Sequence, residues 1–335
     1  METPEDSPLS AKHDFVQLLA AFRSSAILFA ALELDVFSQI PEEGAWPEQL
    51  ELGTGVETTR LRLLLNGLTA LGLLEQQGGR VLVPRQYAAL LRRGPSSFVS
   101  YLLAQKREAE HLLHLATTLQ GGGAGPWFAD ELRHSEQAWP YLAYIEETTA
   151  TWVNHLVDRL KPLVDKARRV LCIGGGHGTV LRHLLDLNPS LEVTLLDLKP
   201  AVAYCLARLA DTPYAQRLAF VAGDPRTQEV PRQFDLVLID NVLHYYSWEG
   251  KREIVRNGWQ ALLPGGRLAM VKLRLEANGI EPPETSLFSL KILAISRHGY
   301  QETDAESIAL LGHVLARDIQ LIHLTAHHSL VTGLQ

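Results

Sequence analysis

Three glycines and two aspartates are spaced as a nucleotide-binding site requires. Gly174, Gly176 and Gly178 lie in the stretch RVLCIGGGHGTV, between an apolar run and a segment with helical spacing. Glycine allows a tight turn and close approach of a ligand to the backbone, because it has no Cβ. Asp197 ends the next apolar run, VTLLD, and Asp224 ends the following one, VAGD. A carboxylate at Asp197 can accept hydrogen bonds from both ribose hydroxyls, with Asp224 beside the base, so the spacing predicts a nucleotide site.

The glycine spacing also discriminates between nucleotides. A pyrophosphate carrier favours G-x-G-x-x-G and a helix N-terminus free to receive phosphate. This chain has G-x-G-x-G with no arginine close behind. The pattern favours an adenosine without phosphate, such as S-adenosylmethionine, over NAD. We expect Leu198 and Pro225, which directly follow the two acids, to contact the cofactor, with Arg226 beside the adenine and Asp240 near the amino-acid end.

His244, in VLHYYSWEG, is the candidate catalytic base. It lies just beyond the apolar run FDLVLID, near the expected position of a transferred methyl group. A phenol or enol must lose its proton to attack a methyl carbon, and the pKa of a phenol is about 10. A neutral imidazole is suited to take that proton near pH 7. From position alone, a histidine that merely caps the strand is an equally good interpretation.

From about residue 167 the chain alternates apolar strands with amphipathic helices. The expected strands are RRVLCIGG, LEVTLLDL, LAFVAGD, FDLVLIDNVL and GRLAMVKLRL. This alternation predicts an α/β fold with a doubly wound, Rossmann-like parallel sheet that is covered on both faces. Ligands bind such sheets outside the carboxyl ends of the strands, which is where the glycines, the aspartates and His244 fall.

The N-terminal part has helical patterns followed by a hairpin pattern, the order found in a winged helix. Five leucines fall on one face of a predicted helix: Leu61, Leu64, Leu65, Leu68 and Leu71. Gly72 is placed to end that helix in a left-handed conformation, and Gly78 and Gly79 supply a tight hairpin turn. The supposed recognition helix has only Arg60 and Arg62 as cations. We therefore expect a packing or dimerisation module and not a DNA-binding one.

Composition narrows the class of protein. The 335 residues carry a net charge of -7, with 46% hydrophobic and 21% charged residues. These values are typical of a globular protein and argue against nucleic acid or an anionic membrane as partner. Two cysteines indicate a reducing, cytoplasmic compartment, and the apolar stretch AILFAALELDVF is too short to span a bilayer. We expect a dimerisation domain at 1–95, a helical linker and substrate-pocket region at 96–165 and a cofactor-binding catalytic domain at 166–335.

The motifs, taken in order, resemble those of the S-adenosylmethionine-dependent O-methyltransferases of small molecules, a family of plant caffeic-acid and flavonoid enzymes and of bacterial natural-product enzymes. The resemblance covers ALELDVFSQI and LRLLLNGLTALGLLEQQGG near the N-terminus, then VLCIGGGHG, LLDLKPAV, AGDP, FDLVLIDNVLHYYSWEG and ALLPGGRL. It implies a seven-stranded sheet, S-adenosylmethionine as cofactor, an aromatic or anionic small-molecule acceptor and an intertwined homodimer. It also implies that His244 is the general base. We expect Tyr245 and Lys272 to shape the acceptor site beside it.

Several positions depart from the family's pattern. The family's LHDW is LHYY here, and the two carboxylates that would orient the base should fall near Lys272 and Gln301. A cation at Lys272 disfavours a protonated imidazole. We expect Lys272 either to bind a substrate anion or to be an ordinary salt-bridged lysine. Cys172 stands where relatives place an aspartate, so weaker cofactor binding is expected.

Other chemistry stays open at this stage. The family that this chain resembles includes members that hydroxylate or catalyse pericyclic steps with the cofactor bound. Some of its relatives methylate α-keto acids with a histidine-bound metal. His244 with His298 would be the pair for such a metal. The spacing of Cys and His gives no zinc signature, and the absence of G-x-S-x-G argues against a serine hydrolase.

Overall fold

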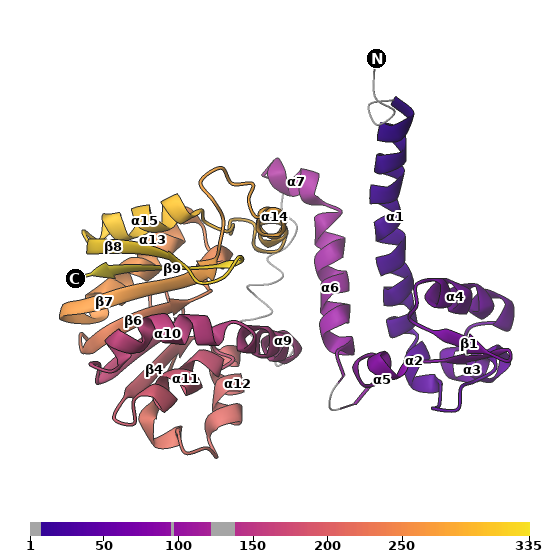
Figure 1. Cartoon of the computed structure of the whole chain (residues 1–335), viewed down its shortest axis with the longest axis horizontal. Coiled ribbons are helices and arrows are strands. Elements are labelled where there is room, and N and C mark those ends of the chain that lie inside the picture. Colours follow the sequence, from indigo (N-terminus) through magenta and orange to yellow (C-terminus); the bar gives the residue numbers. More distant parts are fainter. Residues whose placement is uncertain (1–7, 95–96, 122–137) are drawn as a thin grey trace. The chain divides into compact units, whose positions relative to one another are not determined.

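The computed structural model describes residues 8–94, 97–121 and 138–335 (Figure 1). The chain divides into two compact units, Met1–Arg107 and Glu108–Gln335. The linker and pocket region predicted at 96–165 lies partly outside the described residues. Its boundaries therefore stay a prediction.

The first unit has the predicted helices followed by a hairpin. Its elements are α1 (Pro8–Glu33), α2 (Val36–Gln39), α3 (Pro47–Thr54), α4 (Thr58–Ala70), β1 (Glu75–Gln77), β2 (Arg80–Leu82) and α5 (Arg85–Leu91), followed by α6 (Val99–Leu112), which crosses into the second unit. The two strands pair antiparallel around Gly78 and Gly79, as predicted. On α4, Leu61, Leu65 and Leu68 are buried, while Leu71 at the end of the predicted stripe is 39% exposed.

Helix α1 is long and apolar, and its N-terminal part is exposed. By length and composition alone, its segment Asp14–Glu33 would be able to cross a membrane, and only 11% of it is buried. The prediction from AILFAALELDVF missed this, because the helix extends further toward the N-terminus. Apolar side chains crowd the exposed part: Phe15, Val16, Leu18, Leu19 and Phe22. A helix that buries such a face against a partner chain has the same composition, so a single helix of this kind is weak evidence for a membrane.

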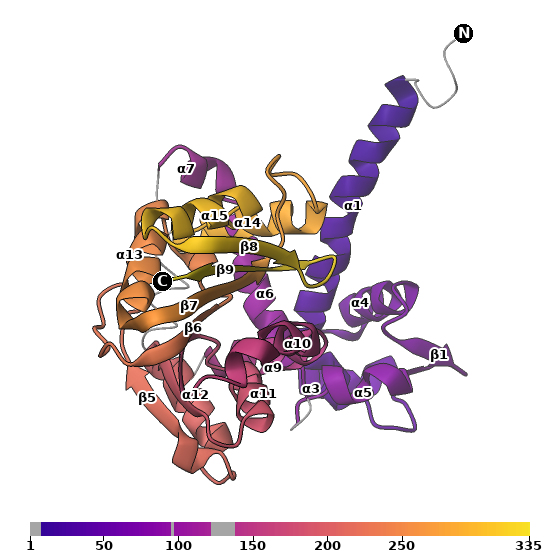
Figure 2. The same cartoon turned by 60° about the vertical axis from the view of Figure 1, so that its left-hand side comes forward.

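The second unit is a seven-stranded sheet with helices on both faces (Figure 2). Its strands are β3 (Arg169–Gly174), β4 (Glu192–Asp197), β5 (Leu218–Ala222), β6 (Phe234–Asp240), β7 (Leu262–Leu273), β8 (Arg317–His323) and β9 (His328–Leu334), in the order β5-β4-β3-β6-β7-β9-β8. The five strands expected from the sequence are confirmed, and they pair in parallel. The last two strands were not in the residue pattern; β9 runs antiparallel to both of its neighbours.

The helices of this unit form two layers and a group near the strand ends. They are α7 (Leu115–Leu119), α9 (Trp139–Ala150), α10 (Val153–Val164), α11 (Thr179–Leu187), α12 (Lys199–Leu209), α13 (Trp248–Ala261), α14 (Pro283–Ser296) and α15 (Asp304–His313). One core cluster joins α10, α11 and α12 to one sheet face, and another joins α13 and α15 to the opposite face. Alternate strand residues supply the two faces, as a pleated strand requires.

The register of the parallel strands brings the predicted site residues together. Gly174, at the end of β3, pairs with Asp240, at the end of β6. Asp197 ends β4, on the other side of β3. A short 3-10 turn, η4 (Leu243–Tyr245), follows β6 and carries His244. The glycine turn, both acids and the candidate base therefore meet at one edge of the sheet.

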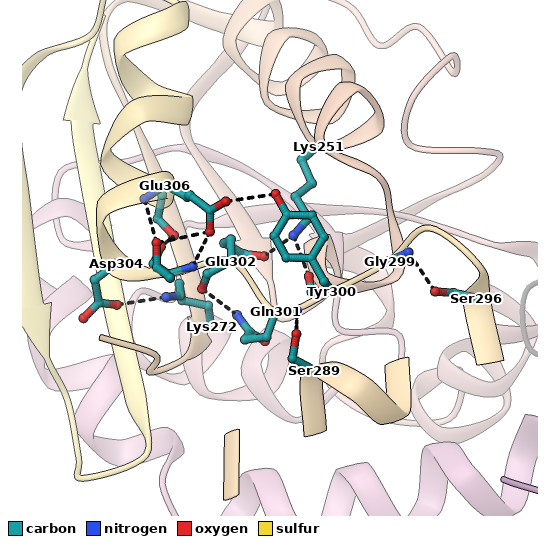
Figure 3. Close-up of polar contacts among 12 residues, drawn as sticks. Lys251, Lys272, Ser289, Ser296, Gly299, Tyr300, Gln301, Glu302, Asp304 and Glu306 are labelled. Atoms are coloured by element: carbon teal, nitrogen blue, oxygen red, sulfur yellow. Dashed lines mark hydrogen bonds and ion pairs between the residues drawn. The ribbon is translucent and has the colours of Figure 1, made fainter. Parts of the chain in front are cut away.

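A buried lysine fixes the loop that packs against this turn. Lys251, on α13, is fully buried; its Nζ donates to Glu302 Oε2 at 2.8 Å and to the Tyr300 carbonyl at 2.6 Å (Figure 3). Burial alone would raise the pKa of Glu302, but the charges of Lys251 and Lys272 hold it below its ordinary value. In the same loop, any Cβ at Gly299 would overlap the His244 carbonyl oxygen. Lys251 thus anchors the segment that supports the base-bearing turn.

We predict that Lys251→Met lowers the free energy of unfolding by about 3–5 kcal/mol, because it leaves Glu302 charged and buried without its partner. Replacing both residues, as Lys251→Met with Glu302→Leu, should recover most of that loss. Urea denaturation of the full chain measures both. Lys161→Met is the matched control, since the pair of Lys161 with Asp165 is half exposed and should contribute less than about 1 kcal/mol. Equal losses for the two single variants would contradict the prediction.

Candidate active site

The glycine turn has no room for side chains. Gly174, Gly175 and Gly178 have φ values of 81°, 73° and 83°, in the left-handed region that favours glycine. A Cβ at Gly176 would lie 2.5 Å from the Ala201 Cβ. Gly175, which the alternating pattern did not select, lies directly against Asp240, and a Cβ there would overlap Asp240 Oδ2. Gly174, Gly175 and Gly176 therefore let the chain pass close to the ends of β4 and β6, while a Cβ at Gly178 would meet Cys205 and Leu209 of α12.

Asp197 is held by the turn that it was predicted to serve. Its Oδ2 accepts the Gly176 N–H at 3.1 Å and its Oδ1 accepts the Leu198 N–H at 2.7 Å. Burial raises the pKa of Asp197 to about 6, although these two hydrogen bonds oppose the rise. A carboxylate offers about four lone-pair positions, so acceptor capacity remains for a ligand.

Asp224 is tied to Arg226. The Arg226 guanidinium approaches its carboxylate with both Nε and Nη2, the latter at 2.6 Å. The same guanidinium lies 5.5 Å from the centre of the Tyr246 ring. Pro225, which lies between Asp224 and Arg226 in the chain, is buried, and its carbonyl accepts a hydrogen bond from Asn257 Nδ2 at 2.9 Å. The arrangement gives a rigid corner at the end of β5, where the sequence placed the base of the nucleotide.

Asp240 carries an unsatisfied carboxylate oxygen. The residue is only 4% exposed, and its Oδ2 accepts no hydrogen bond from any described residue. Burial, and then the charge of Asp197, raise the pKa of Asp240 to about 7. The nearest basic group is His177 Nε2, at 3.9 Å. Sequence reasoning missed His177; an imidazole in the variable position of a glycine turn was the available signal.

His244 is buried and neutral. It is 4% exposed, and its Nε2 has no hydrogen-bond partner among the residues that the structure describes. Burial lowers the pKa of His244 to about 3; the charge of Glu302 opposes this and those of Lys251 and Lys291 add to it. The Tyr245 ring lies 4.1 Å away and the Phe288 ring 5.2 Å away, edge to face. His244 is thus an uncharged imidazole close to two aromatic rings, and its Nε2 is buried without a hydrogen-bond partner among the described residues.

Tyr245 continues the aromatic surface beside His244. Its hydroxyl forms a hydrogen bond with that of Tyr141 on α9. Both phenols pack with Phe288 against Ile292 and Ile295 of α14. Burial raises the pKa of both tyrosines well above the ordinary value, so both are uncharged at neutral pH. This cluster is suited to a flat, apolar ligand.

Lys272 and Gln301 stand where the family has the two carboxylates that orient the base. They lie near each other, but neither can act as a free carboxylate (Figure 3). Lys272 is 3% exposed and its Nζ donates to Asp304 Oδ1 at 2.8 Å (Figure 3). It is thus a salt-bridged lysine, and binding a substrate anion would require it to leave Asp304. Gln301 is 1% exposed, and its Oε1 accepts no hydrogen bond within the described part of the chain. The buried carboxylate of this loop belongs to the next residue, Glu302.

The three buried or half-buried lysines of this region are all neutralised by carboxylates at 2.8 to 3.0 Å: Lys251 with Glu302, Lys272 with Asp304 and Lys291 with Glu108. The described residues contain no group of three or more His, Cys, Asp or Glu that would hold a metal ion. His298, which was considered with His244 for such a metal, is exposed.

Comparison with known proteins identifies the family. An O-methyltransferase domain matches residues 114–314, and an O-methyltransferase dimerisation domain matches residues 16–89. The tetracenomycin polyketide synthesis 8-O-methyl transferase TcmO of Streptomyces glaucescens is 25% identical over 96% of both chains. The 3-hydroxy-5-methyl-1-naphthoate 3-O-methyltransferase of Streptomyces sahachiroi is 26% identical over 83% of this chain and 82% of that protein.

Solved structures share the fold across the whole chain. The structure of PigF with SAH has a TM-score of 0.86 at 22% identity and covers 97% of this chain and 99% of its own. Human N-acetylserotonin methyltransferase in complex with SAM has a TM-score of 0.76 at 22% identity, and the match covers 100% of this chain and 99% of that one. The chain therefore belongs to the S-adenosylmethionine-dependent O-methyltransferase family.

Proposed function

We propose that this enzyme methylates a hydroxyl group of a small, planar, uncharged natural product, with His244 as general base. The observation that carries the proposal is the state of His244: buried, uncharged, close to two aromatic rings, and with no hydrogen-bond partner for its Nε2 among the described residues. A base in this setting is shielded from bulk water.

The residues at the strand ends fit the cofactor. Asp197 would accept the ribose hydroxyls, while Leu198, Asp224 and Pro225 would border the base. Asp240 would receive the ammonium group, since no described residue donates a hydrogen bond to its buried Oδ2. The glycine turn of Gly174, Gly176 and Gly178 would let the ligand lie against the backbone. When bound, S-adenosylmethionine supplies an electrophilic methyl group.

His244 takes the proton of the acceptor hydroxyl at Nε2 in this proposal. Its lowered pKa makes it a weak base, so full proton transfer from a phenol of pKa about 10 is unfavourable before the hydroxyl oxygen has reacted. Proton removal must therefore accompany methyl transfer, and positioning supplies much of the rate. A weak base also favours acceptors whose hydroxyl is acidic, such as those conjugated to a carbonyl.

The acceptor would bind on the aromatic cluster of Tyr141, Tyr245 and Phe288. Because the nearby lysines are already paired, we favour an uncharged acceptor over the anionic one that Lys272 first suggested. The relatives named above are an 8-O-methyl transferase of tetracenomycin polyketide synthesis and a 3-O-methyltransferase of a hydroxynaphthoate. The naphthoate carries a carboxylate, which the acceptor proposed for this enzyme lacks. Tyr245 would hold the plane of the ring system beside His244.

We also propose a homodimer formed through the first unit. The dimerisation-domain match begins at residue 16, within the exposed apolar part of α1. Burying that face in a second copy removes Phe15, Leu18, Leu19 and Phe22 from water.

We predict that His244→Asn lowers kcat by about 100-fold or more, because general base catalysis is lost. The affinity for S-adenosylmethionine, measured by titration calorimetry, should change little. His155→Asn, on the exposed side of α10, is the control and should leave both unchanged. A hydroxynaphthalene serves as probe acceptor, with methyl gain followed by mass spectrometry. If His244→Asn kept normal kcat, the base assignment would be wrong.

We predict that kcat, at saturating cofactor and acceptor, stays level between pH 5 and about pH 7.5. An ordinary histidine loses its basic form below a pKa of about 6.5, but His244, with its pKa lowered to about 3, is still neutral at pH 5. The pH dependence of kcat, with KM recorded separately at each pH, gives the answer. A fall in kcat with a midpoint near pH 6.5 would show that His244 is solvated.

We predict that 2-naphthol is methylated with a kcat/KM at least about tenfold higher than a hydroxynaphthoate of the same ring size, because an unpaired carboxylate is costly to bury. Glu108→Gln tests the cause, since it leaves Lys291 without its carboxylate. That variant should shift the ratio toward the naphthoate. A wild-type preference for the carboxylate would revive the anionic acceptor.

A further inference from the structure

The buried carboxylate of Asp240 needs a positively charged ligand in a fixed place. Its Oδ2 lies under the backbone of Gly175 and accepts no hydrogen bond from the described residues. Leaving a buried carboxylate without a partner is expensive, whereas a bound ammonium group would satisfy it. The free-energy cost of burying Asp240 is offset only when a ligand binds it, so its carboxylate has to be oriented toward that ligand.

His177 is the residue placed to orient Asp240. It is 5% exposed and sits inside the glycine turn. Its Nδ1 accepts the Thr179 N–H at 3.3 Å, so the ring proton is on Nε2. That Nε2 faces Asp240 Oδ2 at 3.9 Å. The distance is too long for a hydrogen bond, so the two groups would have to move closer by about 1 Å or somewhat less to form one.

We propose that His177 is a positioning residue of the cofactor site, which directs the Asp240 carboxylate toward the ammonium group of S-adenosylmethionine. The inference rests on the proposal that the glycine turn binds the cofactor, and adds a residue that the sequence pattern did not select. His177 acts through Asp240 and is not itself a ligand of the reacting atoms.

A neutral imidazole suits this task better than a cation. Burial, and then the charge of Arg182, lower the pKa of His177 to about 4, so it is uncharged at neutral pH. It can donate a hydrogen bond to Asp240 without cancelling the negative charge that attracts the ammonium group. A lysine or arginine at position 177 would form an ion pair with Asp240 and compete with the ligand.

Cys172 fits the same arrangement. It lies on β3 beside β6, and burial and then the charge of Asp240 raise the pKa of its thiol well above the ordinary value. The thiol is therefore uncharged. An aspartate at position 172 would add a second buried carboxylate near Asp240, and the two would repel each other. The negative charge of this part of the site thus comes from β6.

The groups facing Asp240 also make cofactor binding depend on pH. They are His177 from the glycine turn, Cys172 from β3 and Asp197 from β4. The pKa of Asp240 is about 7 without ligand, so part of the population is protonated at neutral pH. An ammonium ligand favours the ionised form, so binding releases protons near pH 7 and affinity rises with pH from about 6 to 7.5. Above this range the α-amino group of the ligand, with a pKa of about 7.7–8.0, begins to lose its own proton.

The test compares ligands with and without the ammonium group on the full chain. Titration calorimetry measures the affinity for S-adenosylmethionine, for S-adenosylhomocysteine and for methylthioadenosine, which has no amino-acid end. His177→Leu removes the donor and should weaken the first two about tenfold, the usual range for one hydrogen bond to a charged group. Methylthioadenosine should bind as it does to the wild type. His177→Gln keeps a donor and an acceptor and should restore affinity to within about threefold.

Three results would overturn the inference. His177→Leu with unchanged affinity for S-adenosylmethionine would show that Asp240 needs no orienting partner. An equal loss for methylthioadenosine would show that His177 only shapes the turn. A loss confined to S-adenosylmethionine would assign the effect to the sulfonium charge. Gly176→Val distinguishes a failure of the His177 proposal from a failure of the proposed cofactor site. It should abolish binding of all three ligands, and normal binding by that variant would overturn the cofactor site itself.

Discussion

The parallel register of β3 and β6 is the constraint on which the site depends. It sets Gly174 opposite Asp240, and the short turn after β6 then places His244 only four residues further along the chain. The cofactor turn, the acid beneath it and the candidate base are thus fixed by one strand pairing. That pairing is buried on both faces by apolar side chains, which leaves it little freedom to slip.

Around this edge the buried charges fall into two kinds. The lysines beside the acceptor surface are paired with carboxylates, so their charges stabilise loops and are not offered to a ligand. Asp197 and Asp240, at the strand ends, keep acceptor capacity and have raised pKa values. If the proposed sites are right, a cationic cofactor would meet negative charge, while the acceptor would meet neutral aromatic rings and a neutral imidazole.

Much of this site could be predicted from the sequence because strand ends are local features. The apolar runs before Gly174, Asp197 and Asp240 identify the strands, and parallel packing places their ends together. The pairing of Lys272 with Asp304, 32 residues away, could not be read from any local pattern. Nor could the last two strands, since β8 is a largely exposed edge strand with weak alternation. The unsatisfied Oδ2 of Asp240 could not be predicted either, because it depends on the hydrogen-bond donors of every described element packed around it.

The departures from the family pattern acquire a common explanation in the structure. Acids are missing at Cys172 and Gln301, yet buried carboxylates occur close by, at Asp240 on the adjacent strand and at Glu302 on the next residue. Their environments decide their roles. Glu302 forms an ion pair with Lys251 at 2.8 Å, which stabilises the loop. The charge of Glu302 raises the pKa of His244, but the charge of Lys251 opposes this effect. Among the residues that the structure describes, Asp240 forms an ion pair with no lysine or arginine, and only the neutral His177 imidazole lies near it, so its charge is available to a ligand. In the proposed function, the chain thus keeps negative charge for the cofactor and has a weaker base in His244.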